Sequence, residues 1–547
     1  MTPKPSPHGT KPDHDILIIG TGFAGLGMAI QLKKSGFHDF VLIEKEPDVG
    51  GTWLVNRYPG CACDVQSHLY SFSFEPNADW SREFATQPEI LAYLRRCTDK
   101  HALRSHVQFG TQVVGARYDD QAQVWRIILA STDEVDAVVK QLGLKPGEVP
   151  ASEAAVAELR TRTVSARVLV SGLGGLSTPA YPNLPGIEDF RGVTFHSQRW
   201  REDYDLRGKR VAVIGTGASA IQFVPQIQPL VAQLDVYQRT PPWILPKFDR
   251  SLGWLERWFL RNVPGVRALR RLALYLRLEA RAVAFMHATW LLAFATLPAR
   301  LYLRLRVRDP VLRRKLTPKY SVGCKRVLLS NDWLPALTAP NVSLVSEGAA
   351  SVKQHSVVDA SGVERPADAI IFGTGFRVSD PIPSGLLRGR DGRDLAAEWK
   401  ESGPEAYKGT TINGFPNLFV LVGPNTAIGH TSLVYMIESQ IRYVMSALEY
   451  MRKQGVATLE VKRAAQTEFN REIQRRSAGT VFTAGGCRSY YLDAKTSKNI
   501  AIWPDYSFRF RQLTRRFDPQ QYHLSPATCA QASPFASADR PPRDALA

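Results

Sequence analysis

Two glycine-rich turns in this 547-residue chain have the residue types and spacing that bind the phosphates of a dinucleotide. The first is Gly20-Thr21-Gly22-Phe23-Ala24-Gly25, which follows an apolar run. Gly20 permits a tight turn, Gly22 lets a pyrophosphate approach the backbone, and Gly25 lets the next helix lie close to the strand. Glu44 ends the following apolar run, 19 positions after Gly25. A carboxylate there accepts hydrogen bonds from ribose hydroxyls, so the pattern predicts a nucleotide site.

The second turn is Gly215-Thr216-Gly217-Ala218-Ser219-Ala220, with alanine in the third glycine position. Here Arg239 takes the place of the acid, 19 positions past Ala220. A guanidinium binds a 2′-phosphate bidentately, whereas a carboxylate would repel it. We therefore expect FAD at the acidic site and NADPH at the basic site, with Thr240 as a further donor and hydride transfer between the two cofactors. A solvated surface arginine is the alternative interpretation of Arg239.

The elements that must position these turns form an α/β fold with two Rossmann-like dinucleotide-binding domains, one for FAD and one for NADPH. Apolar runs at 168–172, 369–375 and 418–424 are typical of further buried strands. The predicted organisation is a tail at 1–12, an FAD-binding domain at 13–182 and 376–522, an NADPH-binding domain at 183–375 with a helical insertion at 250–320, and a tail at 523–547. Both tails are predicted to be disordered, and 131–162 is predicted to be a surface insertion.

Charge is concentrated in the insertion. The whole chain carries a net charge of +18, and residues 250–316 contain fourteen Arg and one Lys against three acidic residues, which gives +12. No nucleic-acid-binding motif accompanies this charge, so we exclude nucleic acid as a partner. A basic amphipathic helical segment has two remaining interpretations: a cap over a domain, or a contact with an anionic membrane surface.

Six cysteines are sparse and irregularly spaced. They imply no disulfide framework and fit a reducing cytoplasm. Cys61 and Cys63 form a C-x-C, but no second Cys or His pair follows at zinc spacing, so no metal site is predicted. The expected location is the cytoplasm, with the peripheral membrane contact of 250–320 as the open alternative.

Two longer motifs carry a resemblance to a known family. Phe190-Arg191-Gly192-Val193-Thr194-Phe195-His196-Ser197-Gln198-Arg199-Trp200 resembles the F-x-G-x-x-x-H-x-x-x-W fingerprint of type I Baeyer–Villiger monooxygenases. Gly50-Gly51-Thr52-Trp53, followed by Tyr58-Pro59-Gly60 and Asp64, resembles the family's G-G-x-W and Y-P-G-x-x-x-D pattern. The resemblance covers residues 13–520. It departs at Arg201, where relatives usually have Pro or Asp, and at Tyr490, where relatives often have a Trp that packs on the nicotinamide nucleotide.

The resemblance implies an activity and the residues that perform it. NADPH reduces FAD, O2 then forms a C4a-peroxyflavin, and one oxygen is inserted next to a ketone carbonyl to give an ester or lactone. Arg326 would face the peroxyflavin, Lys325 would reach the 2′-phosphate, and Asp64 would orient Arg326. His196 would be structural, at the domain junction. The predicted FAD contacts are Gly20, Gly22, Gly25, Glu44, Gly51, Thr52, Trp53, Asp64, Tyr70, Val113 and Leu433, and the predicted NADPH contacts are Gly215, Thr216, Gly217, Ala218, Ser219, Ala220, Arg239, Thr240, Lys325, Arg326 and Tyr490.

Two other functions remain open at this stage. Related flavin-containing monooxygenases that oxygenate nitrogen or sulfur have a fingerprint ending in Tyr or Phe, so Trp200 favours the Baeyer–Villiger branch. A membrane-surface NADPH oxidase or sensor would use the basic insertion and release only peroxide. Without the family motifs, Asp64 would be interpreted as a turn residue and the Lys325-Arg326 pair as part of a solvated loop.

Overall fold

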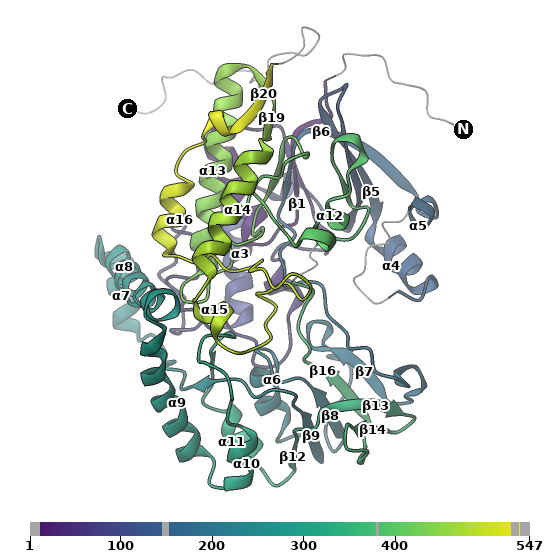
Figure 1. Ribbon diagram of the computed structural model, residues 1–547, viewed down its shortest axis with the longest axis vertical. Helices are drawn as coiled ribbons and strands as arrows, with labels where there is room; N and C mark the ends of the chain where they lie inside the picture. The colour runs from purple at the N-terminus through teal and green to yellow at the C-terminus, as the bar shows by residue number, and fades with distance from the viewer. Residues whose placement is uncertain (1–10, 145–152, 379–381, 527–534, 536–547) are drawn as a thin grey trace.

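The computed structural model describes residues 11–144, 153–378, 382–526 and 535. The larger domain, at the top of Figure 1, is built on an eight-stranded sheet in the order β17-β4-β5-β6-β1-β2-β3, with β18 also paired to β6. Its strands are β1 (His14–Ile19), β2 (Phe40–Ile43), β3 (Val107–Gln108), β4 (Thr111–Asp119), β5 (Val124–Ser131), β6 (Thr161–Ser171), β17 (Leu387–Arg388) and β18 (Leu418–Val420). The central β1 is apolar at Ile16 to Ile19 because both sheet faces are covered.

Helices cover one face of this sheet. Helix α1 (Phe23–Lys34) follows the first glycine turn and packs beside α13 (Leu433–Gln454) and α3 (Gln87–Lys100). The opposite face buries Leu17 and Ile19 against Leu395 and Trp399 of α12 (Leu395–Ser402). The first glycine turn therefore lies at the carboxyl end of a strand that is held from both sides.

The smaller domain contains a five-stranded parallel sheet in the order β12-β9-β8-β16-β7. Its strands are β7 (Val193–His196), β8 (Arg210–Ile214), β9 (Gln233–Tyr237), β12 (Val342–Val345) and β16 (Ala369–Phe372), and α6 (Ala220–Ile227) follows the second glycine turn. These two sheets confirm the predicted α/β fold with two Rossmann-like domains.

The chain crosses between the domains twice, and the two crossing segments touch. Ala180 N donates to Gly375 O at 2.9 Å, and Thr374 Oγ1 donates to Ala180 O at 2.6 Å. After the second crossing the chain returns to the first sheet, where β18 pairs in parallel with β6. The domains are thus tied at a double junction rather than by a single linker.

Helices occupy most of the segment 250–320. They are α7 (Trp254–Asn262), α8 (Val266–Glu279), the short turns η4 (Val283–His287) and η5 (Thr289–Leu291), α9 (Leu292–Arg306) and α10 (Pro310–Lys315). This segment, which we call the insertion, forms one edge of the molecule, with α7 and α8 beside the larger domain and α9 beside the smaller one (Figure 1). No single helix of the described chain combines the length and apolar character needed to cross a bilayer. One pair of helical segments in the described chain meets these criteria when the two are taken together. The pair is Val266–His287 and Thr289–Arg306, which are bent by 111° relative to one another.

The ends of the chain differ from their prediction in part. Residues 523–526 belong to β20 (Tyr522–Pro526), which pairs antiparallel with β19 (Val456–Val461), so the predicted disordered tail does not begin at 523. Phe535 packs on Phe37 with ring centroids 5.4 Å apart. The remainder of that tail, and residues 1–10, lie outside the described residues. The surface insertion predicted at 131–162 contains α4 (Thr132–Gln141) and α5 (Glu153–Ala157) between β5 and β6.

The close approach of α1 to β1 generates a stability prediction. A Cβ at Gly25 would lie 1.9 Å from the carbonyl oxygen of Gly20, so Gly25→Ala must push the helix off the strand. We expect at least about 2 kcal/mol of lost unfolding free energy, measured by urea denaturation. The matched control is Gly253→Ala, where a Cβ meets no atom within 4 Å and φ is −64°. Equal stability of the two variants would contradict the proposed close packing.

Candidate active site

The first nucleotide turn has the backbone that its glycines predict. Gly20 adopts φ +91°, and a Cβ there would lie 3.0 Å from Gly172 O. Gly22 lies against Gly51, where φ is +52° and a Cβ would lie 2.8 Å from the Gly22 Cα. The second motif, Gly50-Gly51, is therefore packed directly on the first turn, with the N-terminus of α1 beside both. Exposed backbone N–H groups at such a helix start attract phosphates.

Glu44 lies beside this turn, at the end of β2. Its Oε2 accepts hydrogen bonds from Thr21 N at 2.8 Å and Thr21 Oγ1 at 2.6 Å, and its Oε1 accepts from Glu46 N at 3.0 Å. The carboxylate is buried, yet it retains lone pairs beyond these three bonds. It can therefore both hold the turn and accept from a ribose hydroxyl.

Aromatic side chains line the next part of the site. Trp53 Nε1 donates to the Tyr70 hydroxyl at 3.2 Å, and the two rings meet edge to face at 5.6 Å. Burial raises the pKa of Tyr70 well above its ordinary value, so the phenol stays neutral. Thr52 begins the short helix that carries Trp53, and Leu433 begins α13. Val113, by contrast, is a buried residue of β4 and belongs to a different hydrophobic cluster from Trp53 and Tyr70.

The second nucleotide turn repeats this geometry. Gly215 adopts φ +111°, and a Cβ there would lie 2.4 Å from Gly373 O. A Cβ at Gly217 would make only an ordinary contact, 3.9 Å from Gly373 O, and Ser219 is the N-cap of α6, which begins at Ala220. The methyl group of Ala220 faces Gly373, which explains why alanine fits the third glycine position. Thr216 and Thr240 adjoin one another, with Thr216 Oγ1 3.5 Å from Thr240 O.

Two cations lie together at this second site. Burial and then the positive charge of Arg239 lower the pKa of Lys325 below its ordinary value. Arg239 itself is exposed just after β9. Two like charges held within range of each other destabilise the protein unless an anion joins them. A phosphate beside both cations would offset this charge, and the contact of Arg239 and Lys325 with the 2′-phosphate stays a prediction.

The central contact is a bidentate ion pair between the two domains. Arg326 Nε donates to Asp64 Oδ2 at 2.5 Å, and Arg326 Nη2 donates to Asp64 Oδ1 at 2.6 Å. The Asp64 charge raises the pKa of Arg326 well above its ordinary value. Burial opposes ionisation of Asp64, but the guanidinium lowers the pKa of that carboxyl nonetheless. The side chains keep 34% and 27% of their exposure, and Nη1 makes no hydrogen bond to any described residue, so a donor remains for a reacting group.

Two tyrosines flank the guanidinium. The rings of Tyr490 and Tyr491 meet at 4.6 Å, and both phenols are near enough to Arg326 to raise its pKa further. Tyr491 is buried, whereas Tyr490 is 49% exposed and can offer its ring to a ligand. The nucleotide contact of Tyr490 stays a prediction.

A disulfide ties the two loops that carry these residues. Cys324 and Cys487 are bonded across a sequence separation of 163, which corrects the expectation of no disulfide. Sequence spacing could not pair them because their proximity arises only from the fold. Cys61, Cys63 and Cys97 are free and buried. The bond holds the Lys325-Arg326 loop against the segment that leads to Tyr490.

Sequence reasoning missed Gln222, which connects the Tyr58-to-Asp64 loop with α6. Its Nε2 donates to Ala62 O at 3.0 Å, and its Oε1 accepts from Tyr58 Oη at 3.1 Å. A Cβ at Gly60 would lie 2.8 Å from Gln222 O, so the loop packs directly on the helix. The only sequence signal was its place two residues after Ala220, and that spacing does not identify a partner.

The fingerprint residues are structural. His196 is fully buried, its Nδ1 accepts from Gln198 N at 3.1 Å, and burial lowers its pKa to about 4, so the imidazole is neutral at physiological pH. Trp200 packs on Phe195 and Phe223, with ring centroids 5.2 and 5.4 Å away. The motif thus fixes β7 against α6 at the domain junction, as the resemblance implied for His196.

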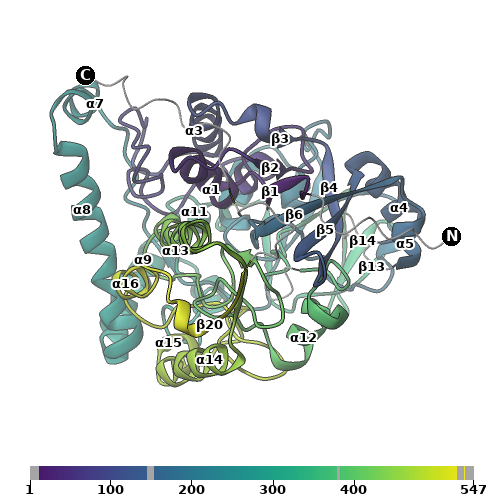
Figure 2. The ribbon, with the colours of Figure 1, turned by 90° about the horizontal axis from the view of Figure 1, so that it is seen from above.

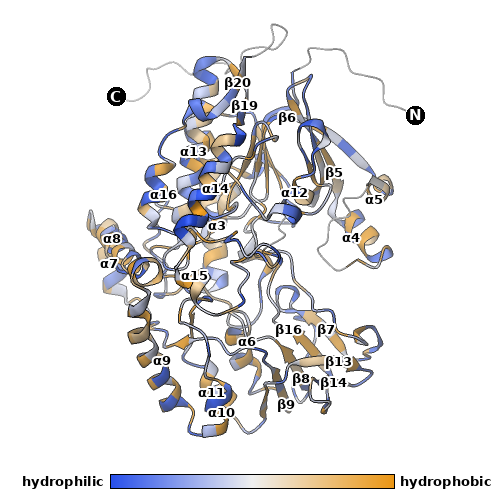
Figure 3. Ribbon diagram, in the orientation of Figure 1, coloured by the Kyte–Doolittle hydropathy of each residue, from blue (hydrophilic) through white to orange (hydrophobic). Residues whose placement is uncertain are grey.

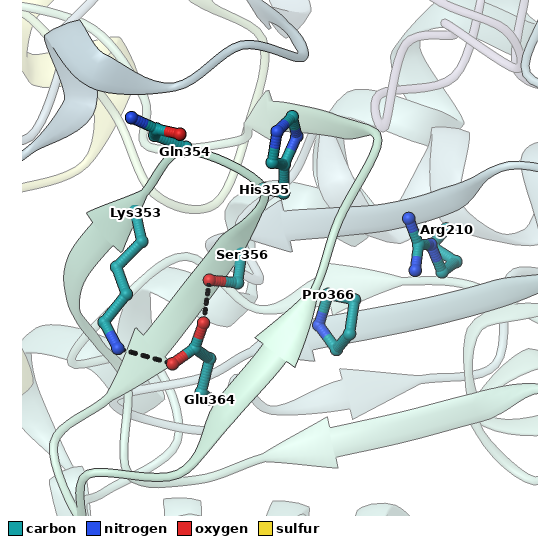
Figure 4. A pocket seen from close by; sticks show the side chains of 7 residues that line it. All are labelled: Arg210, Lys353, Gln354, His355, Ser356, Glu364 and Pro366. Carbon is teal, nitrogen blue, oxygen red and sulfur yellow. Dashed lines mark hydrogen bonds and ion pairs between the residues drawn. The ribbon is translucent and has the colours of Figure 1, made fainter.

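A shallow basin of about 450 Å³ lies elsewhere, on the β13 (Ala349–Lys353), β14 (Ser356–Asp359) and β15 (Glu364–Pro366) hairpins. Its floor is occupied by an internal pair, since Glu364 accepts from Lys353 and Ser356 (Figure 4). None of the predicted site residues lines it. The basin is therefore separate from the predicted site.

The residues present fit both predicted cofactors. At the first turn, a glycine cradle, a helix N-terminus and a buried carboxylate form the donor and acceptor set that a flavin dinucleotide requires. At the second, an open turn adjoins the Arg239 and Lys325 cations, which suit a phosphorylated ribose. Arg326 and Asp64 lie where the two domains meet.

Comparisons with known proteins agree with this geometry. Residues 18–87 match the family model described as an NAD(P)-binding Rossmann-like domain, and residues 158–256 match the model described as flavin-binding monooxygenase-like. A Baeyer–Villiger monooxygenase of Pseudomonas aeruginosa is 49% identical over 97% of this chain and 95% of its own length. A Baeyer–Villiger monooxygenase of Streptomyces coelicolor is 43% identical over 96% of this chain and 95% of its own.

The fold has solved counterparts as well. The crystal structure of OTEMO in complex with FAD and NADP has a TM-score of 0.79 and 27% identity, covering 94% of this chain and all of that one. Identity near one half over almost the whole length, together with the two nucleotide turns and the Arg326–Asp64 pair, is sufficient to assign the family. This chain belongs to the Baeyer–Villiger monooxygenases.

Proposed function

We propose that the chain inserts one oxygen atom of O2 next to the carbonyl of a ketone, with Arg326 as the catalytic cation. It is a flavin-dependent enzyme that uses FAD and NADPH. The overall reaction converts ketone, O2, NADPH and a proton into an ester or lactone, water and NADP⁺. The observation that carries the catalytic assignment is the bidentate Arg326–Asp64 pair at the meeting point of the two nucleotide domains.

Each cofactor has its own set of residues. FAD would be held by the Gly20-to-Gly25 turn, Glu44 and the Trp53–Tyr70 wall, and NADPH by the Gly215-to-Ala220 turn with Arg239 and Lys325. FAD, when bound there, would supply the activation of O2. The protein's task is to position the ketone and to balance negative charge on oxygen.

Arg326 is suited to that task because it remains charged at any working pH. Attack on a ketone carbonyl places negative charge on the former carbonyl oxygen. A guanidinium already fixed by Asp64 can donate from its free Nη1 without reorganising. Asp64 is a positioning residue, since both its oxygens are bound by Arg326 and burial makes the carboxylate depend on that cation.

Water must be excluded while this charge exists, because water promotes loss of activated oxygen as peroxide. Tyr491, Phe482 and Ile502 belong to a buried apolar cluster beside Cys324, immediately before the Lys325-Arg326 pair. This cluster provides a dry wall next to the guanidinium. It also favours an apolar ketone over a strongly polar one.

Nitrogen or sulfur oxygenation is the less supported alternative, since Trp200 ends the fingerprint and the named relatives are Baeyer–Villiger enzymes. The test is mass spectrometry of products from a panel of ketones, amines and sulfides supplied with NADPH and ¹⁸O2. One labelled oxygen in an ester or lactone supports the proposal. Labelled N-oxide alone, or peroxide with unchanged ketones, would overturn it.

The cytoplasmic location remains a prediction.

Replacing Arg326 should uncouple cofactor oxidation from ester formation. We expect Arg326→Ala to lower kcat for ester formation by at least about 100-fold, because it removes one preorganised oxyanion donor. NADPH should still be consumed, with peroxide as the product. Arg326→Lys keeps the charge but loses the bidentate contact with Asp64. Its ester yield should therefore lie between those of the parent enzyme and Arg326→Ala. Undiminished ester yield in Arg326→Ala would reject the catalytic assignment.

Replacing Arg239 should change the choice of nicotinamide cofactor. Loss of a bidentate phosphate contact in Arg239→Ala should lower kcat/KM for NADPH by about 10- to 100-fold. The value for NADH should change little, which serves as the internal control because NADH lacks the 2′-phosphate. Equal losses with both cofactors would mean that Arg239 supports the fold and does not read the phosphate.

A further inference from the structure

The insertion presents an apolar face to solvent. On α8 the exposed side chains include Leu269, Leu272 and Leu276, and on α9 and the turn before it they are Trp290, Phe294, Leu297, Leu301 and Leu305. These eight side chains are 50–71% exposed. Their spacing of three or four residues places them on one face of each helix. Large apolar residues gathered in this way mark an interaction surface.

The opposite faces of the same helices are packed into the protein. Leu274 and Leu278 of α8, and Leu303 of α9, belong to the main hydrophobic core. Figure 3 shows hydrophobic and hydrophilic bands alternating along α9, and Figure 2 shows α8 along the outer edge of the molecule. The exposed face therefore does not arise from helices that are apolar all round. It is a second apolar face, and no described residue covers it.

Arginines surround this face. Arg277, Arg281, Arg300, Arg304 and Arg308 are exposed, and none forms an ion pair with a residue that the structure describes. The three acids of the segment are engaged within the fold. Glu256 pairs with Arg250, Glu279 is buried against His430 and Ser507, and Asp309 caps α10 through Val311 N. The outward charge of the surface is therefore positive.

The positive charge of this face favours some binding partners over others. A second copy of the chain packed on the same face would bring unpaired arginines against one another, which is unfavourable when the pairs are desolvated. An anionic lipid surface offers phosphates for the arginines and acyl chains for Leu, Phe and Trp. Long arginine side chains can also extend from an apolar face to headgroup level.

We propose that the insertion docks the enzyme on an anionic lipid bilayer, with the exposed faces of α8 and α9 in the interface and the arginines on headgroup phosphates. The helices lie on the membrane and do not cross it, because Leu274, Leu278 and Leu303 hold their inner faces on the protein core. The 111° bend between the two helical parts presents two segments to the surface, which resists rotation of the bound enzyme.

Docking would bring the Arg326 loop near the lipid. Ala282 and Met286, between the two lipid-facing helices, share a buried cluster with Cys324 and Tyr491. A Cβ at Gly323 would lie 3.0 Å from the Phe285 ring, so the insertion is in direct contact with that loop. The same element thus faces lipid on one side and the catalytic loop on the other. The docking itself does not depend on the proposed oxygenation.

The test is co-sedimentation of the FAD-loaded enzyme with sucrose-filled vesicles. The vesicles contain either phosphatidylcholine alone or an equal mixture with phosphatidylglycerol, at low and high salt. We expect binding to the anionic vesicles that weakens with salt, and little binding to phosphatidylcholine alone. The variant Phe294→Ser/Leu301→Ser should reduce binding by at least about tenfold, since it removes buried apolar area. The variant Arg300→Glu/Arg304→Glu should reduce it by roughly fivefold or more per arginine.

Matched controls carry the same chemistry on other faces. Leu230→Ser/Val363→Ser changes two side chains that are each 48% exposed, and Arg160→Glu reverses an exposed charge outside the insertion. Both should bind vesicles like the parent. Ester formation from a water-soluble ketone without vesicles should be unchanged in every variant, which separates failure of docking from failure of folding or of the proposed function.

Three results would overturn the proposal. The first is equal vesicle binding by the insertion variants and the parent. The second is binding that does not depend on lipid charge. The third is a parent dimer in light scattering that Phe294→Ser/Leu301→Ser converts to a monomer, while neither the parent nor this variant binds vesicles. The last result would assign the face to a second copy of the chain.

Discussion

The ion pair between Arg326 and Asp64 is the contact on which the rest of the site depends. Its partners come from different domains and are 262 positions apart. Asp64 stays ionised because the guanidinium is there, and the guanidinium keeps its orientation because both carboxylate oxygens bind it. Removing either charge would leave the other incompletely compensated in a partly buried place. This one interaction therefore links the two domains at the site and fixes the orientation of the Arg326 guanidinium.

Several neighbours support that pair from both sides. Gln222 holds the loop that ends at Asp64, and the Cys324–Cys487 bond holds the loop that carries Arg326. Beside them, burial and then the positive charge of Arg239 lower the pKa of Lys325. A phosphate bound beside both cations would offset this unfavourable charge. The protein thus holds more positive charge at the second nucleotide turn than its own fold neutralises.

The insertion combines two different environments in one set of helices. Its inner side contributes to the core and contacts the loop before Arg326. Its outer side exposes leucine, phenylalanine and tryptophan among arginines that have no acidic partner in the described chain. A cap that only covered a domain would need the first side alone. The membrane proposal accounts for the exposed apolar outer face, whereas a purely structural role does not.

The sequence by itself determined the parts whose physics is local. Apolar runs that end in glycine turns predicted β1, β8 and their helices because a strand, a positive φ and a close helix depend on neighbouring residues. Glu44 and Arg239 could be predicted as ribose and phosphate contacts from their distance to those turns. The approach of Arg326 to Asp64 came from family motifs and not from spacing, since no local pattern relates residues so far apart.

Only the tertiary structure decided the remaining contacts. It revealed Gln222, the Cys324–Cys487 bond and the clustering of Lys325 with Arg239, all of which form between distant segments. It placed Val113 in the core, because β4 is covered on that face. It also converted 523–526 from a predicted tail into β20, whose polar sequence is ordered by backbone pairing with β19. A polar segment of low intrinsic preference becomes a strand when a neighbouring edge satisfies its hydrogen bonds, and that edge is not visible in the segment's own sequence.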